Sequence, residues 1–467
     1  MCMKFNHEEE EDNFSITRYE SMLRSNDLKF FDSDEFESII HHYLENGKIA
    51  KAKKAISLGL AQHPSSVNLK LLQVEVLVFE DRLDKADILL AQLHAIEPEN
   101  EEIYIQKANI LSKQNKHKKA ISLLLKALEF TDETADIYSL LGMEYLFLDD
   151  FENAKLNFMQ CLNNDDEDYS ALYNIIYCFD FLDQHTEAIE FLNNFLDKNP
   201  YCEVAWHQVG KQYYDLKEFE KALAAFEFAI ISDEYFIGAY LEKGKVLEKL
   251  KRYNEAIENY RITLELDDPT SFALLRIGTC FEKLGNEELA IQHFSQTVHE
   301  DPLLDKGWIA ITDFYTRKKN YQKALYYINK AIHIDSENVL YWKRYAKINN
   351  RLGFFEEAEN GFRKALELGN YELETWLNRS DILRFLGESE AAVQNLKQAI
   401  EFYPENAEVH YRIAGLFFEN QDFESGEKHL REGLDLDYEY HIVLEELYDK
   451  IYELPLVKRI IAEYEHI

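Results

Sequence analysis

The segment WHQVGKQYYDLKEFEKALAAFEFA, residues 206–229, carries the pattern that decides the fold of this chain. Ala222 in this segment belongs to a series of alanines in which each position number exceeds the one before it by 34. A fixed period of this length is typical of tandem structural repeats that stack on one another. The series comprises Ala52, Ala86, Ala120, Ala154, Ala188, Ala222, Ala256, Ala290, Ala324, Ala358 and Ala392, and its next position holds Gly426.

Prolines and tryptophans keep the same period. The prolines in phase differ in position number by 34 or by three times 34, and they lie at Pro64, Pro98, Pro200, Pro302 and Pro404. The tryptophans, whose position numbers differ by 102, 34 and 34, lie at Trp206, Trp308, Trp342 and Trp376. Three residue types in one phase predict twelve repeats from Ser33 to about Tyr440, with no insertion or deletion.

The order of residues within a repeat resembles that of the tetratricopeptide-repeat (TPR) family, in which an aromatic residue is followed by Leu-Gly, Tyr, Ala, Phe, Ala and Pro. The sixth repeat shows it in Trp206, Val209, Gly210, Tyr213, Ala222, Phe226 and Ala229. The resemblance implies an all-α fold, a right-handed α-solenoid superhelix of about twelve TPR helix pairs with terminal capping helices. Neither helix of a pair, A or B, can bury its apolar stripe alone, so neighbouring repeats must stack.

The pattern divides the chain into four parts. We expect residues 1–14 to be a disordered acidic tail, residues 15–32 an N-terminal capping helix, residues 33–440 the twelve repeats, and residues 441–467 capping helices interrupted at Pro455. The twelfth repeat has glycine at both alanine positions, Gly426 and Gly433, so we expect its B helix to pack most loosely.

The amino-acid composition disfavours some classes of binding partner. The chain has 51 Lys and Arg against 87 Asp and Glu, a formal net charge of −36, which disfavours nucleic acid and anionic lipid as partners. No apolar run approaches the roughly 20 residues needed to cross a bilayer, so we expect no membrane insertion. The start of the sequence resembles no secretory signal, and the five cysteines form no Cys-x-x-Cys pair. We therefore expect a cytoplasmic location with reduced thiols.

Motifs for catalysis and for cofactors are absent from the sequence. It contains no Gly-x-Gly-x-x-Gly, no P-loop and no Gly-x-Ser-x-Gly segment. No His-x-x-x-His pair or acidic cluster has the spacing of a metal site. We therefore predict a protein that is not an enzyme, has no catalytic residues and binds neither a cofactor nor a metal.

The resemblance implies that the A helices line a concave face, and the repeat period then gives the residues on it. In repeats 1–6 these are apolar: Phe79, Met143, Phe147, Tyr173, Tyr177, Phe181 and Tyr214. In repeats 7–12 many are basic: Lys245, Arg276, Lys306, Lys343, Arg344, Lys347, Arg351, Arg384 and Arg412. The basic set either attracts an acidic partner or pairs with carboxylates of neighbouring A helices, and the sequence leaves both open.

These observations predict a non-catalytic adaptor or scaffold that binds an extended or helical segment of a protein partner in the concave groove. An acidic segment would favour repeats 7–12, and an apolar one repeats 1–6. Two alternatives stay open. The chain is a structural subunit of a larger assembly or a homo-oligomer, with groove charges that only pair internally, or the acidic run at residues 8–12 occupies the groove and blocks it.

Overall fold

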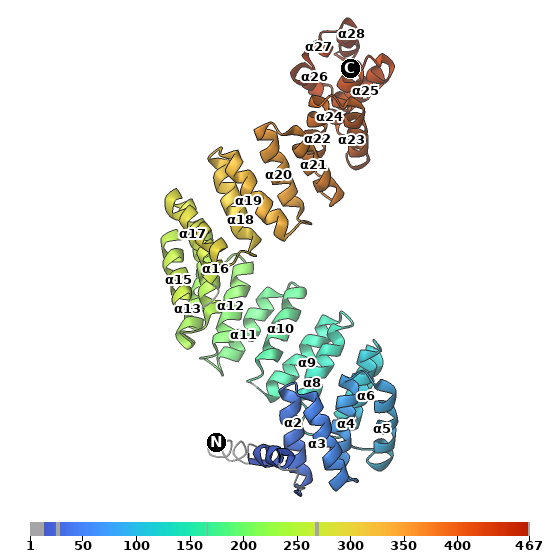
Figure 1. The fold of residues 1–467 in the computed structure, drawn as a ribbon, viewed down its shortest axis with the longest axis vertical. Helices are drawn as coiled ribbons and strands as arrows, with labels where there is room; N and C mark the ends of the chain where they lie inside the picture. The colour runs from blue at the N-terminus through green and yellow to red at the C-terminus, as the bar shows by residue number, and fades with distance from the viewer. Residues whose placement is uncertain (1–13, 25–28, 166, 267–269, 466–467) are drawn as a thin grey trace. The chain divides into compact units, whose positions relative to one another are not determined.

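The computed structural model describes residues 14–24, 29–165, 167–266 and 270–465, and within these ranges the regular structure is helical, without a strand. Figure 1 shows the helices in chain order from blue to red. The chain divides into two compact units, Met1–Asp233 (unit 1) and Glu234–Ile467 (unit 2), which are described separately. None of the helices in the described ranges is long and apolar enough to cross a membrane.

Unit 1 begins with a helix over residues 14–24. Six pairs of antiparallel helices follow, in which the even-numbered helix is A and the odd-numbered helix is B. They are α2 (Ser33–Glu45), α3 (Ile49–Gln62), α4 (Val67–Phe79), α5 (Leu83–Ile96), α6 (Glu101–Lys113), α7 (His117–Ala127), α8 (Ala135–Leu146), α9 (Phe151–Asn164), α10 (Tyr169–Phe181), α11 (His185–Leu196), α12 (Glu203–Asp215) and α13 (Phe219–Ser232).

Unit 2 continues with six more pairs and ends in short helices. The pairs are α14 (Ile237–Lys249), α15 (Tyr253–Glu265), α16 (Thr270–Lys283), α17 (Glu287–Glu300), α18 (Asp305–Arg317), α19 (Tyr321–Ile334), α20 (Val339–Leu352), α21 (Phe355–Glu367), α22 (Leu373–Phe385), α23 (Ser389–Phe402), α24 (Ala407–Glu419) and α25 (Phe423–Leu436). The terminal helices are η1 (Glu439–His441), α26 (Ile442–Leu447), α27 (Asp449–Tyr452) and α28 (Pro455–Tyr464).

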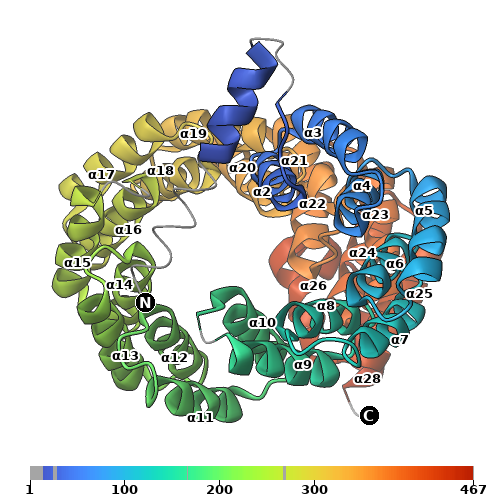
Figure 2. The same ribbon diagram turned by 90° about the horizontal axis from the view of Figure 1, so that it is seen from below.

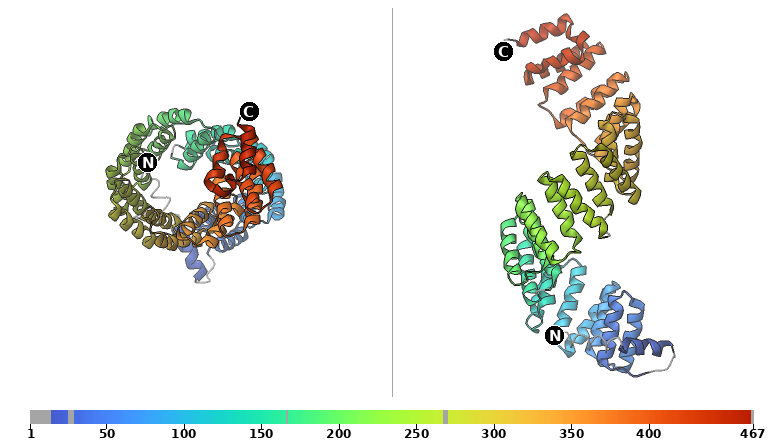
Figure 3. Two further views of the ribbon diagram at one scale, coloured as in Figure 1. Left: turned by 90° about the horizontal axis from the view of Figure 1, so that it is seen from above. Right: turned by 90° about the vertical axis from the view of Figure 1, so that its left-hand side faces the viewer.

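The A helices of each unit form its inner layer. In unit 1, α10 and α12 lie inside α11 and α13, and in unit 2, α14, α16 and α18 lie inside α15, α17 and α19 (Figure 2). Within each unit the helices stack side by side in chain order (Figure 3). All of the predicted site residues except Phe147 lie on A helices.

The turn between helices A and B has the same backbone form in every pair. One residue of each turn is left-handed, with φ between 56° and 81°, and these residues recur with the repeat period. Only four of them are glycine, the residue that adopts this conformation without steric cost. The residues are Gly47, Asp81, Asn115, Asp149, Asp183, Lys217, Lys251, Gly285, Lys319, Gly353, Gly387 and Gln421.

Glycines on the A helices let the aromatic ring of helix B approach the backbone. A Cβ atom built on Gly210 would lie 2.5 Å from the ring of Phe226, which is fully buried. The same geometry recurs at Gly142 with Phe158 and at Gly278 with Phe294, each with a separation of 2.6 Å. The alanines of helix B, among them Ala222 and Ala229, are also fully buried. The residues that repeat in the sequence are thus those at which helices A and B pack most closely.

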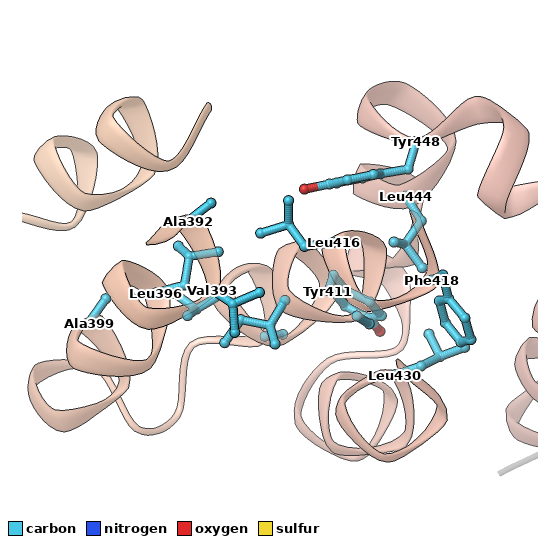
Figure 4. Packing of buried hydrophobic residues seen from close by; sticks show 14 of the residues in the cluster. Ala392, Val393, Leu396, Ala399, Tyr411, Leu416, Phe418, Leu430, Leu444 and Tyr448 are labelled. Carbon is cyan, nitrogen blue, oxygen red and sulfur yellow. The ribbon is translucent and has the colours of Figure 1, made fainter. Parts of the chain in front are cut away.

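The twelfth pair differs from our expectation of a loose B helix. The ring of Phe418 covers Gly426, where a Cβ would lie 2.8 Å from it, and the ring of Tyr411 covers Gly433 at 3.1 Å. Both rings are buried in a cluster with Leu430 (Figure 4). The prediction of looseness was wrong because large side chains of α24 fill the space that the missing methyl groups leave.

The C-terminal segment is broken twice, at Tyr448 as well as before Pro455. Tyr448 has φ −137° and ψ 52°, which ends α26. Its ring covers Gly415, where a Cβ would lie 2.7 Å away, and its hydroxyl donates to the carbonyl oxygen of Arg412 at 3.2 Å. Tyr448 and Leu444 thereby cover the end of the apolar core of unit 2 (Figure 4).

We expected one capping helix over residues 15–32. Residues 14–24 are helical and residues 29–32 are not, and residues 25–28 lie outside the described part of the chain. Tyr19 and Met22 of this helix are buried together with Phe31, which precedes the first repeat, and with Phe36 and Tyr43 of that repeat. Residues 1–13, which contain the acidic run, lie outside the described residues.

Candidate functional site

Ion pairs join each A helix of unit 2 to the next, from α14 to α24. In the first of these, Arg276 of α16 donates two hydrogen bonds to Glu248 of α14, at 2.8 and 2.6 Å, and Tyr260 donates a third at 2.8 Å. We call the series the ion-pair ladder: Arg276–Glu248, Arg317–Glu282, Arg344–Asp313 (3.0 Å), Lys347–Glu374 (2.8 Å) and Arg384–Glu419 (2.6 Å).

Most of the basic residues predicted on the concave face carry such a partner. Arg412 contacts Asp381 and Glu408, Lys343 contacts Glu372 at 2.5 Å, and Lys245 contacts Glu242 at 2.7 Å. Hydrogen bonds from Lys343 and Lys347 lower the pKa of the carboxyl groups of Glu372 and Glu374. In the described part of the chain, Lys306 and Arg351 are exposed and have no ion pair. Most of these basic side chains are therefore already paired with carboxylates of the same chain.

A cleft of about 520 Å³ lies on the same face, between α18, α20 and α22. It brings together three of the predicted residues, Arg344, Lys347 and Arg351. The carboxylates of Asp313 and Glu374 also line it, and the remaining lining residues are Thr316, Tyr321, Ile348, Asn350, Phe362 and Asn378. The other predicted basic residues do not line this cleft.

The predicted apolar residues of unit 1 lie on α4, α8, α10 and α12. Phe79 and Phe181 are the most exposed, at 66% and 61%, and Tyr214 is half-buried against Phe219. Phe181 stacks on Phe151 with ring centroids 3.7 Å apart, and Phe147 stacks on His117 at 4.9 Å. Met143, Tyr173 and Tyr177 are also exposed. This surface is partly ordered by its own stacking, and Phe79 lies apart from it on α4.

Two carboxyl groups of unit 1 are half-buried on neighbouring A helices, Glu75 on α4 and Glu102 on α6. Burial raises the pKa of both groups, and the charge of Glu75 raises the pKa of Glu102 further. Because a raised pKa means that the folded state binds the proton more tightly, the ionised group destabilises the fold above that pKa. The penalty disappears below the unfolded value of about 4.3.

Replacement of Glu102 by glutamine should therefore raise the melting temperature of unit 1 at pH 7. The glutamine oxygen can still accept the hydrogen bond of Gln106, which is 2.7 Å long in the native protein. The gain should vanish when melting is measured at pH 4 or below. Glu101→Gln makes the same change of net charge one residue away, and a gain of equal size in that variant would contradict the explanation by burial.

The four described cysteines, Cys161, Cys178, Cys202 and Cys280, are buried and free of disulfides. Burial raises the pKa of the Cys178 thiol to about 11 and that of Cys161 to about 12. A thiol with so high a pKa is a poor nucleophile at neutral pH.

One group of side chains in unit 2 was not predicted from the sequence. The structure brings His410 of α24 within hydrogen-bond distance of Glu432 and next to His429, both on α25. The spacing of His429 and Glu432, three residues apart on one helix, was the available signal. His410 lies on the other helix of the pair, 19 residues before His429, so the three side chains match no metal-binding motif within a single helix.

Comparison with known proteins identifies the repeats. Models of the tetratricopeptide repeat match residues 101–133, 135–168, 170–200 and 241–304, and a further TPR-repeat model matches residues 381–421. The human protein O-mannosyl-transferase TMTC3 is 34% identical over 96 residues, which are 20% of this chain. The match spans only 10% of the length of that relative.

Solved structures with similar folds are also TPR proteins. The C-terminal part of a TPR repeat-containing protein from Cytophaga hutchinsonii is 17% identical, with a TM-score of 0.44, over 52% of this chain and 99% of that one. A tetratricopeptide repeat protein from Parabacteroides merdae is 17% identical, with a TM-score of 0.41, over 53% of this chain and 98% of that one. YrrB, described as a TPR protein with an unusual peptide-binding site, is 17% identical, with a TM-score of 0.31, over 38% of this chain and 92% of that one.

The family models match separate stretches of both units, and every matched stretch folds as helices of the A–B series. This chain belongs to the tetratricopeptide-repeat family.

Proposed function

We propose that this chain is a protein-interaction scaffold without catalytic activity, and that it holds an extended, acidic segment of a partner protein in the cleft of unit 2. TPR repeats in general support protein interaction, and the cleft between α18, α20 and α22 is the observation that carries the finer proposal. A cytoplasmic location and the absence of nucleic-acid partners remain predictions from the sequence.

The charges in the cleft favour an acidic segment. Arg344 and Lys347 are each paired with one carboxylate, Asp313 and Glu374, whereas Arg351 is exposed and has no ion pair within the described ranges. A carboxylate of the partner can therefore contact Arg351 without breaking an existing pair. In a chain with a net charge of −36, a local positive excess inside a concave wall attracts and orients acidic segments.

The other lining residues suit an extended backbone. Asn350 and Asn378 offer amide donors and acceptors, and Tyr321 and Thr316 offer hydroxyl groups. An extended chain exposes unpaired N–H and C=O groups that such side chains can satisfy. A volume of about 520 Å³ suits a few side chains of a segment rather than a folded domain.

Charge reversal at Arg351 tests this proposal. Peptides would be selected from a random library on the wild-type protein, and their affinities measured by fluorescence anisotropy. We expect the selected peptides to contain Asp or Glu, and Arg351→Glu to weaken their binding at least about tenfold, which corresponds to roughly 1.4 kcal/mol.

Lys283→Glu is the matched control for this experiment. Lys283 occupies the equivalent position at the end of α16, is exposed, and does not line the cleft. Both variants change the net charge and the charge at a helix C-terminus equally. Selected peptides without acidic residues, or equal affinities of the two variants, would contradict the proposal.

The ion-pair ladder favours a second candidate, a structural subunit or homo-oligomer whose groove charges only join its own repeats. Light scattering coupled to size-exclusion chromatography distinguishes the two. A concentration-independent monomer mass disfavours the homo-oligomer, whereas a defined dimer that forms equally in wild type and Arg351→Glu favours it. Blocking of the groove by residues 8–12 remains a prediction, because that run lies outside the described residues.

A further inference from the structure

We propose that His410, His429 and Glu432 form a binding site for a divalent transition-metal ion such as Zn²⁺. This site lies in the last helix pair of unit 2, away from the residues that line the cleft. It is independent of the proposed scaffold function.

Two adjacent helices supply the three ligand atoms. His429 and Glu432 are three residues apart on α25, so their side chains share one face of the helix. His410 projects from α24, which packs against α25. The Nδ1 atom of His410 lies 3.4 Å from Nδ1 of His429 and 3.1 Å from Oε2 of Glu432, and Nδ1 of His429 lies 2.9 Å from the same oxygen.

This triangle has the dimensions of a metal-binding face. Bonds of about 2.0–2.1 Å from zinc to nitrogen or oxygen place tetrahedral ligands roughly 3.3 Å apart and octahedral ligands roughly 2.9 Å apart. The three separations, from 2.9 to 3.4 Å, lie within about 0.1 Å of this range. One ion about 1 Å above the plane of the three atoms can therefore bond to all of them without a rearrangement of the helices.

The surroundings hold the imidazoles in place and leave one side open. The side chains of His410 and His429 are only 10% and 13% exposed, whereas that of Glu432 is 38% exposed, so an ion can enter past the carboxylate. The ring of Phe417 stacks on His429 with centroids 5.7 Å apart, which fixes the orientation of the imidazole. An open position would be filled by water or by a ligand atom from outside the chain.

The charge of Glu432 favours a cation at this site, and two nearby lysines oppose it. Lys428 lies 4.0 Å from the second oxygen of Glu432, and Lys397 lies over the ring of Phe417 at 5.4 Å. Two nitrogens and one carboxylate suit Zn²⁺, Co²⁺ or Ni²⁺, whereas Ca²⁺ and Mg²⁺ prefer oxygen ligands.

Calorimetric titration of the chelator-treated full chain with ZnCl₂ tests the site. The variants are His429→Gln and Glu432→Gln, and the control is His333→Gln, which removes an exposed histidine of α19. We expect wild type and His333→Gln to bind one Zn²⁺ with the same affinity, and the two site variants to bind it at least tenfold more weakly. Zn²⁺ should also raise the melting temperature of wild type and control, but not of the site variants.

Two outcomes would overturn the inference. One is a wild-type affinity equal to that of the site variants, which would leave the three residues as a hydrogen-bonded group. The other is loss of binding in His333→Gln as well, which would indicate adsorption to scattered histidines. If His429→Gln loses helicity by circular dichroism, Glu432→Gln decides, because this carboxylate lies on the exposed side of the group.

Discussion

Replacement of Phe226 by alanine is expected to lower the free energy of unfolding by about 3–5 kcal/mol, the cost of truncating a buried aromatic ring. The ring is fully buried against Gly210, and the three atoms nearest to a Cβ built on that glycine all belong to it. Because repeats stabilise one another through nearest neighbours, the loss should concentrate on α12 and α13. Urea unfolding followed by circular dichroism measures the total loss of unfolding free energy. Hydrogen exchange shows which helices lose protection.

Phe228→Ala, two residues away on the same helix, is the control for this prediction. Its ring is 50% exposed and stacks on Trp206 with centroids 4.7 Å apart. We expect a loss of roughly 1 kcal/mol, since only part of the ring is removed from water and one aromatic pair is lost. Equal losses of unfolding free energy in the two variants would contradict the prediction that the buried ring of Phe226 stabilises the contact between α12 and α13.

Replacement of Arg412 by methionine is expected to lower the free energy of unfolding by about 1–3 kcal/mol, because the partly buried carboxylate of Glu408 loses its charged partner, whereas Asp381 is 45% exposed and can be hydrated. The Arg412 side chain is 11% exposed and contacts both Asp381 and Glu408. Methionine keeps most of the volume and removes the charge, so the loss reports the uncompensated carboxylates rather than a cavity. Chemical unfolding of the full chain measures it.

Lys347→Met removes an exposed ion pair and serves as the comparison for Arg412→Met. Lys347 and Glu374 are 49% and 57% exposed, and such a pair contributes about 0–1 kcal/mol. Its contribution should also fall when salt is added, whereas that of Arg412 should change little. A large, salt-independent loss in Lys347→Met would mean that the ion-pair ladder stabilises unit 2 uniformly, contrary to this prediction.

The helix pairs could be predicted from the sequence because their determinants repeat. Gly210, Ala222 and Phe226 meet within one repeat, so their spacing alone fixes the contact. The same period placed the basic residues on the A helices of unit 2 and gave Arg351 its position at the end of α20.

The partners of those charges could not be predicted in the same way. Arg276 pairs backward with Glu248, whereas Lys347 pairs forward with Glu374, although both lie on A helices. The angle between neighbouring repeats decides which carboxylate a long side chain can reach. The 34-residue period of the sequence does not give this angle. Tyr448, the residue that covers Gly415, lies outside the repeats, so the repeat period could not predict its position either.

The left-handed residues at the A–B turns have a consequence for protein engineering. Lys217, Lys251, Lys319 and Gln421 hold a conformation that costs an L-residue roughly 1 kcal/mol relative to glycine. Asp and Asn at the equivalent turns tolerate it better, because their short side chains can bond locally to the backbone. A thermostable variant can therefore be sought at four equivalent positions, by glycine substitutions that leave the helices and the concave face untouched.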